Sequence, residues 1–148
     1  MKKIVFLILF SYVSLLSFSQ KESGNVRAGN KLYNNKKYTE AEIEYRKGLE
    51  VNKNSFEATF NLGNALYRQG KMDEAMEQYL AAAALQQNES KKVAAAFHNL
   101  GNAFMNKKEY QKSIDAYKMA LKNNPKDNET RYNYAYAKAM LKKQQEQK

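Results

Sequence analysis

Residues that could carry out catalysis are few and scattered in this chain. The 148 residues include one histidine, His98, and no cysteine, which excludes a thiolate zinc site and a cluster of histidine metal ligands. Three aspartates fall at expected helix starts or on solvent faces: Asp73, Asp115 and Asp127. No nucleophile stands beside a base in the pairing that catalysis requires. We therefore expect no catalytic residue, no cofactor and no metal site, and we expect that the protein is not an enzyme.

Asparagines and aromatic residues recur at a regular spacing instead, which suits hydrogen bonding and apolar contact with another molecule. Three segments share a Gly-Asn step, and each has a small residue twelve positions after the glycine. The glycines are Gly29, Gly63 and Gly101, and their small partners are Ala41, Ala75 and Ser113. The first two glycines are 34 residues apart and the next two are 38 apart. The chain therefore contains three repeats, and the second carries four extra residues.

Apolar residues in each repeat follow the helical period of about 3.6 residues, and each repeat divides into two amphipathic helices at a short polar turn. In the middle repeat we expect helices over residues 56–69 and 73–86, joined by a turn at residues 70–72. The four extra residues amount to about one helical turn. We therefore expect a lengthened helix at the alanine-rich junction of residues 81–96. Expected N-caps are Ser55, Ser90 and Asp127, and Thr39 with Glu42 forms a capping box.

Small residues are expected to set the packing between the two helices of each repeat. A side chain at any of the three repeated glycines would push the paired helices apart, and the small partners face these glycines from the second helix. A tyrosine also recurs in each second helix, at Tyr45, Tyr79 and Tyr117. We expect these tyrosines to fill the space between neighbouring hairpins.

These residues give the chain a strong resemblance to the tetratricopeptide-repeat family over residues 22–127. In that family each repeat has glycine at its eighth position, small residues at the twentieth and twenty-seventh, an aromatic residue at the twenty-fourth and proline at the thirty-second. The glycines, their small partners and the tyrosines match, whereas proline occurs only in the third repeat, as Pro125. The resemblance implies an all-α fold: an α-solenoid of three hairpins at residues 22–55, 56–93 and 94–127, followed by a capping helix and polar tail at residues 128–148.

The resemblance also implies that the first helices of the hairpins line a concave face that is free for a partner. The candidate partner-binding residues on this face are Val26, Asn30, Tyr33, Phe60, Asn64, Tyr67, Arg68, His98, Asn102, Met105, Tyr132 and Tyr136. Their asparagines, together with Asn61, Asn99 and Asn133, can hydrogen-bond the backbone of an extended peptide. The alternative is that these asparagines only bond neighbouring helices, and the sequence leaves both possibilities open.

One kind of ligand is not expected in this groove. Domains of this family that grip an acidic carboxyl terminus resemble one another in having Lys at the fifth position of one repeat, and Lys and Arg at the second and sixth positions of a later one. This chain has Val26, Ala95 and Asn99 at those positions. Because charge-assisted hydrogen bonds give such a clamp its strength, we expect no binding of a chaperone tail in that manner.

The amino terminus has the pattern of a signal peptide. Lys2 and Lys3 precede an apolar run over residues 4–16, and Ser17 and Ser19 supply small residues for cleavage before Gln20. The run is short for a bilayer span of about 20 residues. We therefore expect a signal peptide at residues 1–19 and a periplasmic protein after cleavage; an uncleaved segment would anchor the chain. The formal net charge is +10, but export leads us to expect no nucleic-acid partner.

A narrower resemblance links the signal peptide, the basic repeats and residues 124–135 to the tetratricopeptide-repeat proteins of Bat aerotolerance operons. That resemblance implies a scaffold for another protein, exported or membrane-attached, such as a von Willebrand A-type protein. Two alternatives stay open. A basic face could contact anionic lipid at a membrane surface, or the protein could self-associate through its exposed last helix.

Overall fold

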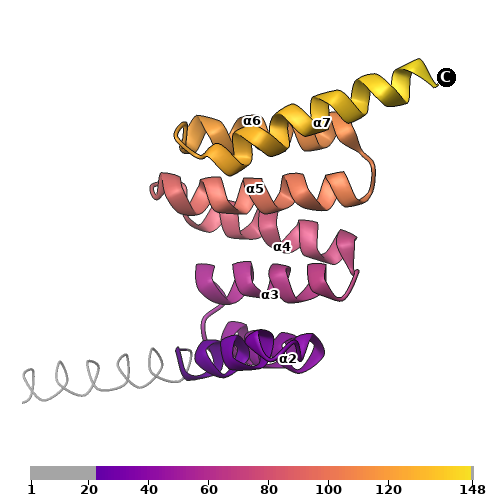
Figure 1. Ribbon diagram of the computed structural model, residues 1–148. Coiled ribbons are helices and arrows are strands. Elements are labelled where there is room, and N and C mark those ends of the chain that lie inside the picture. The colour runs from indigo at the N-terminus through magenta and orange to yellow at the C-terminus, as the bar shows by residue number, and fades with distance from the viewer. Residues whose placement is uncertain (1–22, 148) are drawn as a thin grey trace, which may run out of the picture.

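The computed structural model describes residues 23–147, so the expected signal peptide at residues 1–19 lies outside the described residues. The described residues form seven helices and no strand, which confirms the all-α fold. After a first helix over residues 23–34, the helices are α2 (Tyr38–Val51), α3 (Phe56–Arg68), α4 (Met72–Leu85), α5 (Ser90–Asn106), α6 (Tyr110–Asn123) and α7 (Asn128–Glu146) (Figure 1). The helix boundaries expected for the middle repeat are correct to within one residue.

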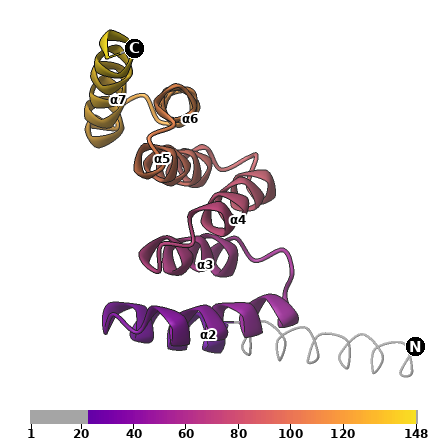
Figure 2. The same cartoon turned by 90° about the vertical axis from the view of Figure 1, so that its right-hand side faces the viewer.

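Each helix packs on the next, so that the chain rises in a zigzag from α3 to α7 (Figure 2). The backbones of α3 and α5, and of α5 and α7, also approach one another. Those of α2 and α4, and of α4 and α6, stay apart. The first helices of the hairpins therefore line the tighter, inner side of the stack, and the second helices are spread along its outer side. This arrangement is the expected α-solenoid, and α7 covers the last hairpin.

The four extra residues of the second repeat lengthen α5. This helix has 17 residues, against 13 in α3, which is the first helix of the preceding hairpin. The second helices α2, α4 and α6 each have 14. The extra turn is residues 90–93, before the position that corresponds to the start of α3. Its first residue, Ser90, is inside the helix and Glu89 is the N-cap, so the expected cap at Ser90 is wrong.

At the centre of each hairpin a buried tyrosine ring is in close contact with a glycine of the other helix. Tyr45, Tyr79 and Tyr117 are among the largest fully buried side chains of the described residues. A methyl group built on Gly63 would lie 2.8 Å from Cε1 of Tyr79, in the same hairpin, and Gly29 and Gly101 have the same relation to the other two tyrosines. The tyrosines therefore fill the space inside their own hairpins. They also pack with the next element, as expected: Tyr117 shares a buried cluster with Ala137 of α7. The glycines are needed because the rings occupy the space of a β-carbon.

The same backbone turn closes all three hairpins. One residue of each turn has a positive φ angle: 60° at Lys36, 79° at Gly70 and 59° at Lys108. Only glycine adopts this left-handed conformation without a steric cost, which is about 1 kcal/mol for other residues. Lys36 and Lys108 adopt this conformation despite the steric cost, so the turns of all three hairpins have similar φ angles.

Side-chain caps begin two of the helices as expected. The Ser55 hydroxyl accepts a hydrogen bond of 3.2 Å from the Ala58 N–H at the start of α3. The Asp127 carboxylate accepts bonds from the N–H groups of Glu129 and Thr130 at the start of α7. The expected capping box of Thr39 and Glu42 is wrong, because α2 begins at Tyr38 and its N-cap, Lys37, makes no side-chain bond. Thr39 is therefore already inside the helix.

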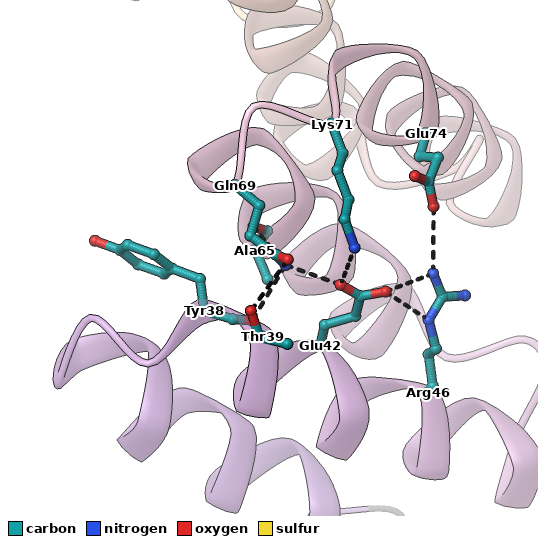
Figure 3. A network of polar contacts seen from close by, with 8 residues as sticks. All are labelled: Tyr38, Thr39, Glu42, Arg46, Ala65, Gln69, Lys71 and Glu74. Carbon is teal, nitrogen blue, oxygen red and sulfur yellow. Dashed lines mark hydrogen bonds and ion pairs between the residues drawn. The ribbon is translucent and has the colours of Figure 1, made fainter.

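Glu42 instead links α2 to the turn between α3 and α4 through hydrogen bonds of its carboxylate. One of its carboxylate oxygens accepts from Arg46, at 2.8 and 3.0 Å, and the other accepts from Gln69 at 2.8 Å and Lys71 at 3.0 Å (Figure 3). Arg46 also lies 3.5 Å from the carboxylate of Glu74. Gln69 follows α3 and Lys71 precedes α4, so this network joins α2 to the next hairpin.

Candidate protein-binding groove

Three hollows follow one another along the inner face of the solenoid, with volumes of about 310, 180 and 400 Å³. The first and second share Tyr33 and Asn64, and the second and third share Tyr67 and Asn102, so the hollows form one continuous groove. The remaining lining residues are Asn30, Asn34, Tyr45 and Asn61 in the first hollow, Arg68, Tyr79 and Asn99 in the second, and Met105, Asn106, Lys108, Tyr110, Tyr117, Asn133, Tyr136 and Met140 in the third.

Most residues that the sequence analysis assigned to partner binding line this groove. Those that the structure brings together there are Asn30, Tyr33, Asn64, Tyr67, Arg68, Asn102, Met105 and Tyr136. Three further lining residues were not predicted: Lys108, Tyr110 and Met140. Met140 occupies the thirteenth position of its helix, which is the position that Arg68 occupies in α3, so the repeat register could have identified it.

The other four candidates lie outside the lining of the groove. Val26 is 9% exposed and packs in the core near Gly48, so its assignment to the groove surface is corrected. Phe60 stacks on Phe56, with ring centroids 5.4 Å apart. Tyr132, on α7, is 72% exposed and does not line any of the three hollows.

His98, the fourth, joins α5 to α7. Its Nδ1 lies 2.6 Å from the hydroxyl oxygen of Thr130, and that hydroxyl donates to the Asp127 carboxylate at 2.7 Å. Because the hydroxyl proton is committed to Asp127, Nδ1 of His98 must be the donor in the first contact. His98 therefore helps to fix the capping helix, with only 12% of its side chain exposed.

A ladder of asparagines runs along the floor of the groove and joins the repeats. Oδ1 of Asn64 accepts from the hydroxyl of Tyr79 at 3.0 Å, in its own hairpin, and from Nδ2 of Asn99 at 2.8 Å, in the next. The same pair of bonds recurs in the repeats on either side. Asn30 accepts from Tyr45 and Asn61, and Asn102 accepts from Tyr117 and Asn133, at distances of 2.6 to 3.2 Å. The asparagines therefore do bond neighbouring helices, which is one of the two possibilities that the sequence left open.

The ladder still leaves amide groups that a ligand can use. Among residues 23–147, Nδ2 of Asn30, Asn64 and Asn102 makes no hydrogen bond, and Oδ1 of Asn61, Asn99 and Asn133 accepts none. All six residues line the groove. The first repeat thus offers a donor to the groove, the second and third repeats each offer a donor and an acceptor, and α7 offers an acceptor. This alternation matches the C=O and N–H groups of an extended polypeptide.

The tyrosine hydroxyls fix the orientation of the asparagine amides in the ladder, because each hydroxyl donates to an asparagine Oδ1. Burial raises the pKa of Tyr45 and of Tyr117 to about 12, and burial also raises the pKa of Tyr79. These hydroxyls therefore stay protonated at physiological pH and donate to the asparagine oxygens. With both acceptor sites of Oδ1 used, each of Asn30, Asn64 and Asn102 is held with its NH₂ group available.

The charged residues that line the groove are all cationic. They are Arg68 and Lys108, and no carboxylate lines any of the three hollows. The Arg68 guanidinium lies 4.9 Å from the centre of the Tyr38 ring, a distance suited to a cation–π interaction. The three positions at which related domains carry the cations that grip an acidic carboxyl terminus hold Val26, Ala95 and Asn99 in this chain, none of which is basic. Val26 is buried, and Asn99 belongs to the ladder. The groove is thus polar, aromatic and weakly basic.

Removing an asparagine of the ladder is expected to weaken folding. Replacement of Asn64 by alanine leaves the buried Tyr79 hydroxyl and the Asn99 amide without their acceptor, which should lower the free energy of unfolding by about 1 to 2 kcal/mol. Asn106→Ala is the matched control, because the Asn106 side chain is exposed and makes no hydrogen bond among the described residues. Urea denaturation followed by circular dichroism measures both. Equal stability of the two variants would contradict the structural role of the ladder.

Other kinds of site find little support in the described part of the chain. It contains no group of three or more His, Cys, Asp or Glu side chains placed to hold a metal ion. None of its helices has both the length and the hydropathy needed to cross a bilayer. The groove is the feature of the described residues that is best suited to binding a polypeptide.

Comparison with known proteins identifies the repeats. Two models of the tetratricopeptide repeat match the chain, one over residues 26–91 and one over residues 94–127. The Hsp70-Hsp90 organising protein of Plasmodium falciparum (isolate 3D7) is 30% identical over 96 residues, which are 63% of this chain and 17% of that protein. This chain therefore spans about one sixth of that relative's length.

Solved structures show the same architecture. The first TPR domain of Spaghetti (RPAP3), bound to the HSP90 peptide SRMEEVD, has a TM-score of 0.76 and 25% sequence identity, over 83% of this chain and 94% of that one. The TPR domain of Sgt2 from Aspergillus fumigatus has a TM-score of 0.77 and 17% identity, over 85% of this chain and 82% of that one. The chain therefore carries tetratricopeptide repeats over residues 26–91 and 94–127, stacked as a helical solenoid.

Proposed function

We propose that this protein is a scaffold that holds a partner protein by an extended segment laid along the groove. The observation that carries the proposal is the set of unused amide groups, three donors and three acceptors, on the floor of a continuous groove. An extended chain presents backbone C=O and N–H groups that need such partners when they leave water. Tyr33, Tyr67 and Met105 supply apolar contacts for its side chains, as aromatic residues and methionine do in other interfaces.

A relative of the same fold supports a peptide as the ligand. The Spaghetti (RPAP3) domain, which is 25% identical, was solved with a short peptide bound. The chemistry of the ligand differs in our proposal, because this chain has no cation at the three clamp positions. We propose a segment that is neutral or mildly acidic and is held by amide and aromatic contacts, with Arg68 and Lys108 disfavouring a basic one.

We further propose that the protein works in the cell envelope, with an exported or membrane-attached partner. The supporting observation is the signal-peptide pattern at residues 1–19. The resemblance to the proteins of Bat operons makes a von Willebrand A-type protein the first partner to examine. Detection of the chain in the periplasmic fraction with its amino terminus near Gln20 would support this location, and detection in the cytoplasm at full length would refute it.

Introducing a negative charge into the groove tests the proposed scaffold. Immobilised protein is used to recover envelope proteins, which are quantified by mass spectrometry. Tyr67→Glu and Arg68→Glu are each expected to lower recovery of the partner about tenfold or more, because a hot-spot contact contributes at least this much. Arg68 is exposed, so its substitution leaves the core intact.

The matched control is Ile43→Glu, on the second helix of the first hairpin, where the side chain is 50% exposed. It adds a negative charge outside the groove and is expected to leave recovery unchanged. If Arg68→Glu recovers the partner as well as the unmodified protein does while Ile43→Glu loses it, the groove is not the binding site.

A further inference from the structure

A second, apolar trough lies between α4, α5 and α6, on the outer side of the solenoid. Figure 2 shows α4 and α6 on the same side of α5. Its volume is about 380 Å³. Its lining residues are Leu80, Ala83 and Ala84 from α4, Gln87 from the following turn, Val93 and Phe97 from α5, and Met119, Lys122 and Asn123 from α6. Leu80 is 51% exposed and Met119 is 41% exposed. Neither of these exposed side chains contributes to the inner groove.

The repeats themselves show that the fold does not require this apolar surface. The helices α2 and α4 have equal length, so their residues correspond one to one. The outward positions Leu80, Ala81 and Ala84 of α4 correspond to Arg46, Lys47 and Glu50 of α2. In α2 Arg46 and Lys47 form ion pairs with nearby carboxylates. One hairpin therefore has an apolar outer face at the positions where its neighbour is charged and solvated.

The extra turn of α5 completes the trough. Val93 belongs to the four-residue extension at residues 90–93 and is 7% exposed. It lines the trough beside Phe97, which lies one turn further along the helix. The insertion that distinguishes the second repeat thus supplies part of the surface that distinguishes it from the other repeats.

Charge in the trough selects among partners. Lys122 is the charged residue of its lining, and no carboxylate lines it. Within residues 23–147, Lys122 makes no ion pair. A ligand that fills the trough and carries a carboxylate near Lys122 would gain an ion pair that the protein alone does not provide.

The walls of the trough favour a helix as the ligand. Both walls are helices, whose main-chain groups are already hydrogen-bonded, so an extended segment would bury its own N–H and C=O groups without partners. A helix satisfies its own main chain and can lay an apolar stripe between two other helices. We propose that this trough binds an amphipathic helix of a partner protein, with its apolar stripe between Leu80 and Met119 and an acidic side chain at Lys122.

A designed peptide tests the proposal without knowledge of the partner. The probe is a stapled helix of about 15 residues, with leucines along one face and glutamates elsewhere; a second probe has lysines in place of the glutamates. Titration of the isotope-labelled protein, observed by NMR, is expected to shift the signals of Leu80, Ala84, Val93 and Met119 with the glutamate probe. The lysine probe is expected to bind at least about tenfold more weakly, a ratio that corresponds to about 1.4 kcal/mol.

Two variants separate the trough from general electrostatics. Lys122→Glu is expected to reverse the preference between the probes, whereas Lys118→Glu changes the net charge equally, one turn away on α6, and should keep the preference. The triple variant L80R/A81K/A84E gives α4 the outer residues of α2, which that position of the fold already tolerates, and should reduce binding of the glutamate probe about tenfold. Its circular dichroism spectrum should be unchanged.

Three results would overturn the proposal. Signal shifts confined to Asn64, Tyr67 and Asn102 would place the probe in the inner groove. Equal effects of Lys118→Glu and Lys122→Glu would show that only net charge matters. A dimer detected by light scattering and abolished by the triple variant would assign the trough to a second copy of this chain.

Discussion

Replacing Gly63 with alanine is expected to lower the free energy of unfolding by about 2 to 3 kcal/mol. The added methyl group would lie 2.8 and 2.9 Å from two ring carbons of Tyr79 and 3.3 Å from Cβ of Gln78. Tyr79 is 2% exposed, and its hydroxyl is bonded to Asn64, so the ring cannot move away without breaking the ladder. Overpacking of this kind typically costs about 1 to 3 kcal/mol. Thermal and urea denaturation both measure the effect.

The control for this prediction is Gly48→Ala, which should have the opposite sign. Gly48 also lies inside a helix and is buried, but a methyl group there would meet its nearest neighbours, Ala58 and Val26, at 3.6 Å, an ordinary contact distance. Alanine favours a helix over glycine by about 1 kcal/mol, so this variant should be more stable than the unmodified protein. If both variants are stabilised, the close contact between tyrosine and glycine is not what the repeats require.

Acidification is expected to remove a second large contribution to stability, centred on Glu42. Burial alone would raise the pKa of this carboxyl, but hydrogen bonds from Gln69, Arg46 and Lys71 outweigh burial and lower the pKa from 4.5 to about 2. A carboxyl whose pKa is lowered by folding stabilises the folded state above its unfolded pKa. That stability is lost as the pH falls from about 4.5 to about 2, and it amounts to on the order of 3 kcal/mol.

The variant Glu42→Gln isolates this contribution. It should be less stable than the unmodified protein at pH 7, and the difference should shrink toward zero near pH 2, when Glu42 is itself protonated. Glu50→Gln is the control on the same helix, because Glu50 is exposed and makes no ion pair among the described residues. Urea denaturation at several pH values compares the three proteins. A constant difference between Glu42→Gln and the unmodified protein across this range would contradict the assignment.

Spacing along the chain was sufficient to predict the helices and their order. The glycine spacing of 34 and then 38 residues predicted a lengthened helix, and α5 is the helix that carries the extra turn. Spacing did not predict that each tyrosine ring lies against the glycine of its own hairpin, because a period defines the face of a helix and not the distance to the next helix. The bonds of Glu42 to Gln69 and Lys71 could not be predicted either, since they join residues 27 and 29 positions apart across two turns.

The candidate groove was predictable to a similar extent. The repeat register placed Asn64, Tyr67 and Asn102 on the inner face, where they line the hollows. It did not indicate depth, which depends on what covers each position. Val26 is buried within the first hairpin, and His98 is bonded to Thr130 of α7. Neither side chain therefore lines the groove, although the repeat register places both on the inner face. The outer trough was not predicted, because it requires two second helices and the extended α5 to be placed together.

The extra turn of α5 is also a feature that the other repeats of the described chain lack. On a surface built from equal units, a ligand that recognises one unit can shift by a whole unit and find nearly the same contacts. The additional turn at residues 90–93 occurs once in the described chain, and because it is close to a full helical turn it leaves the orientation of the following hairpin nearly unchanged. A partner that contacts this turn is restricted to one alignment along the array, while the curvature that shapes the groove is preserved.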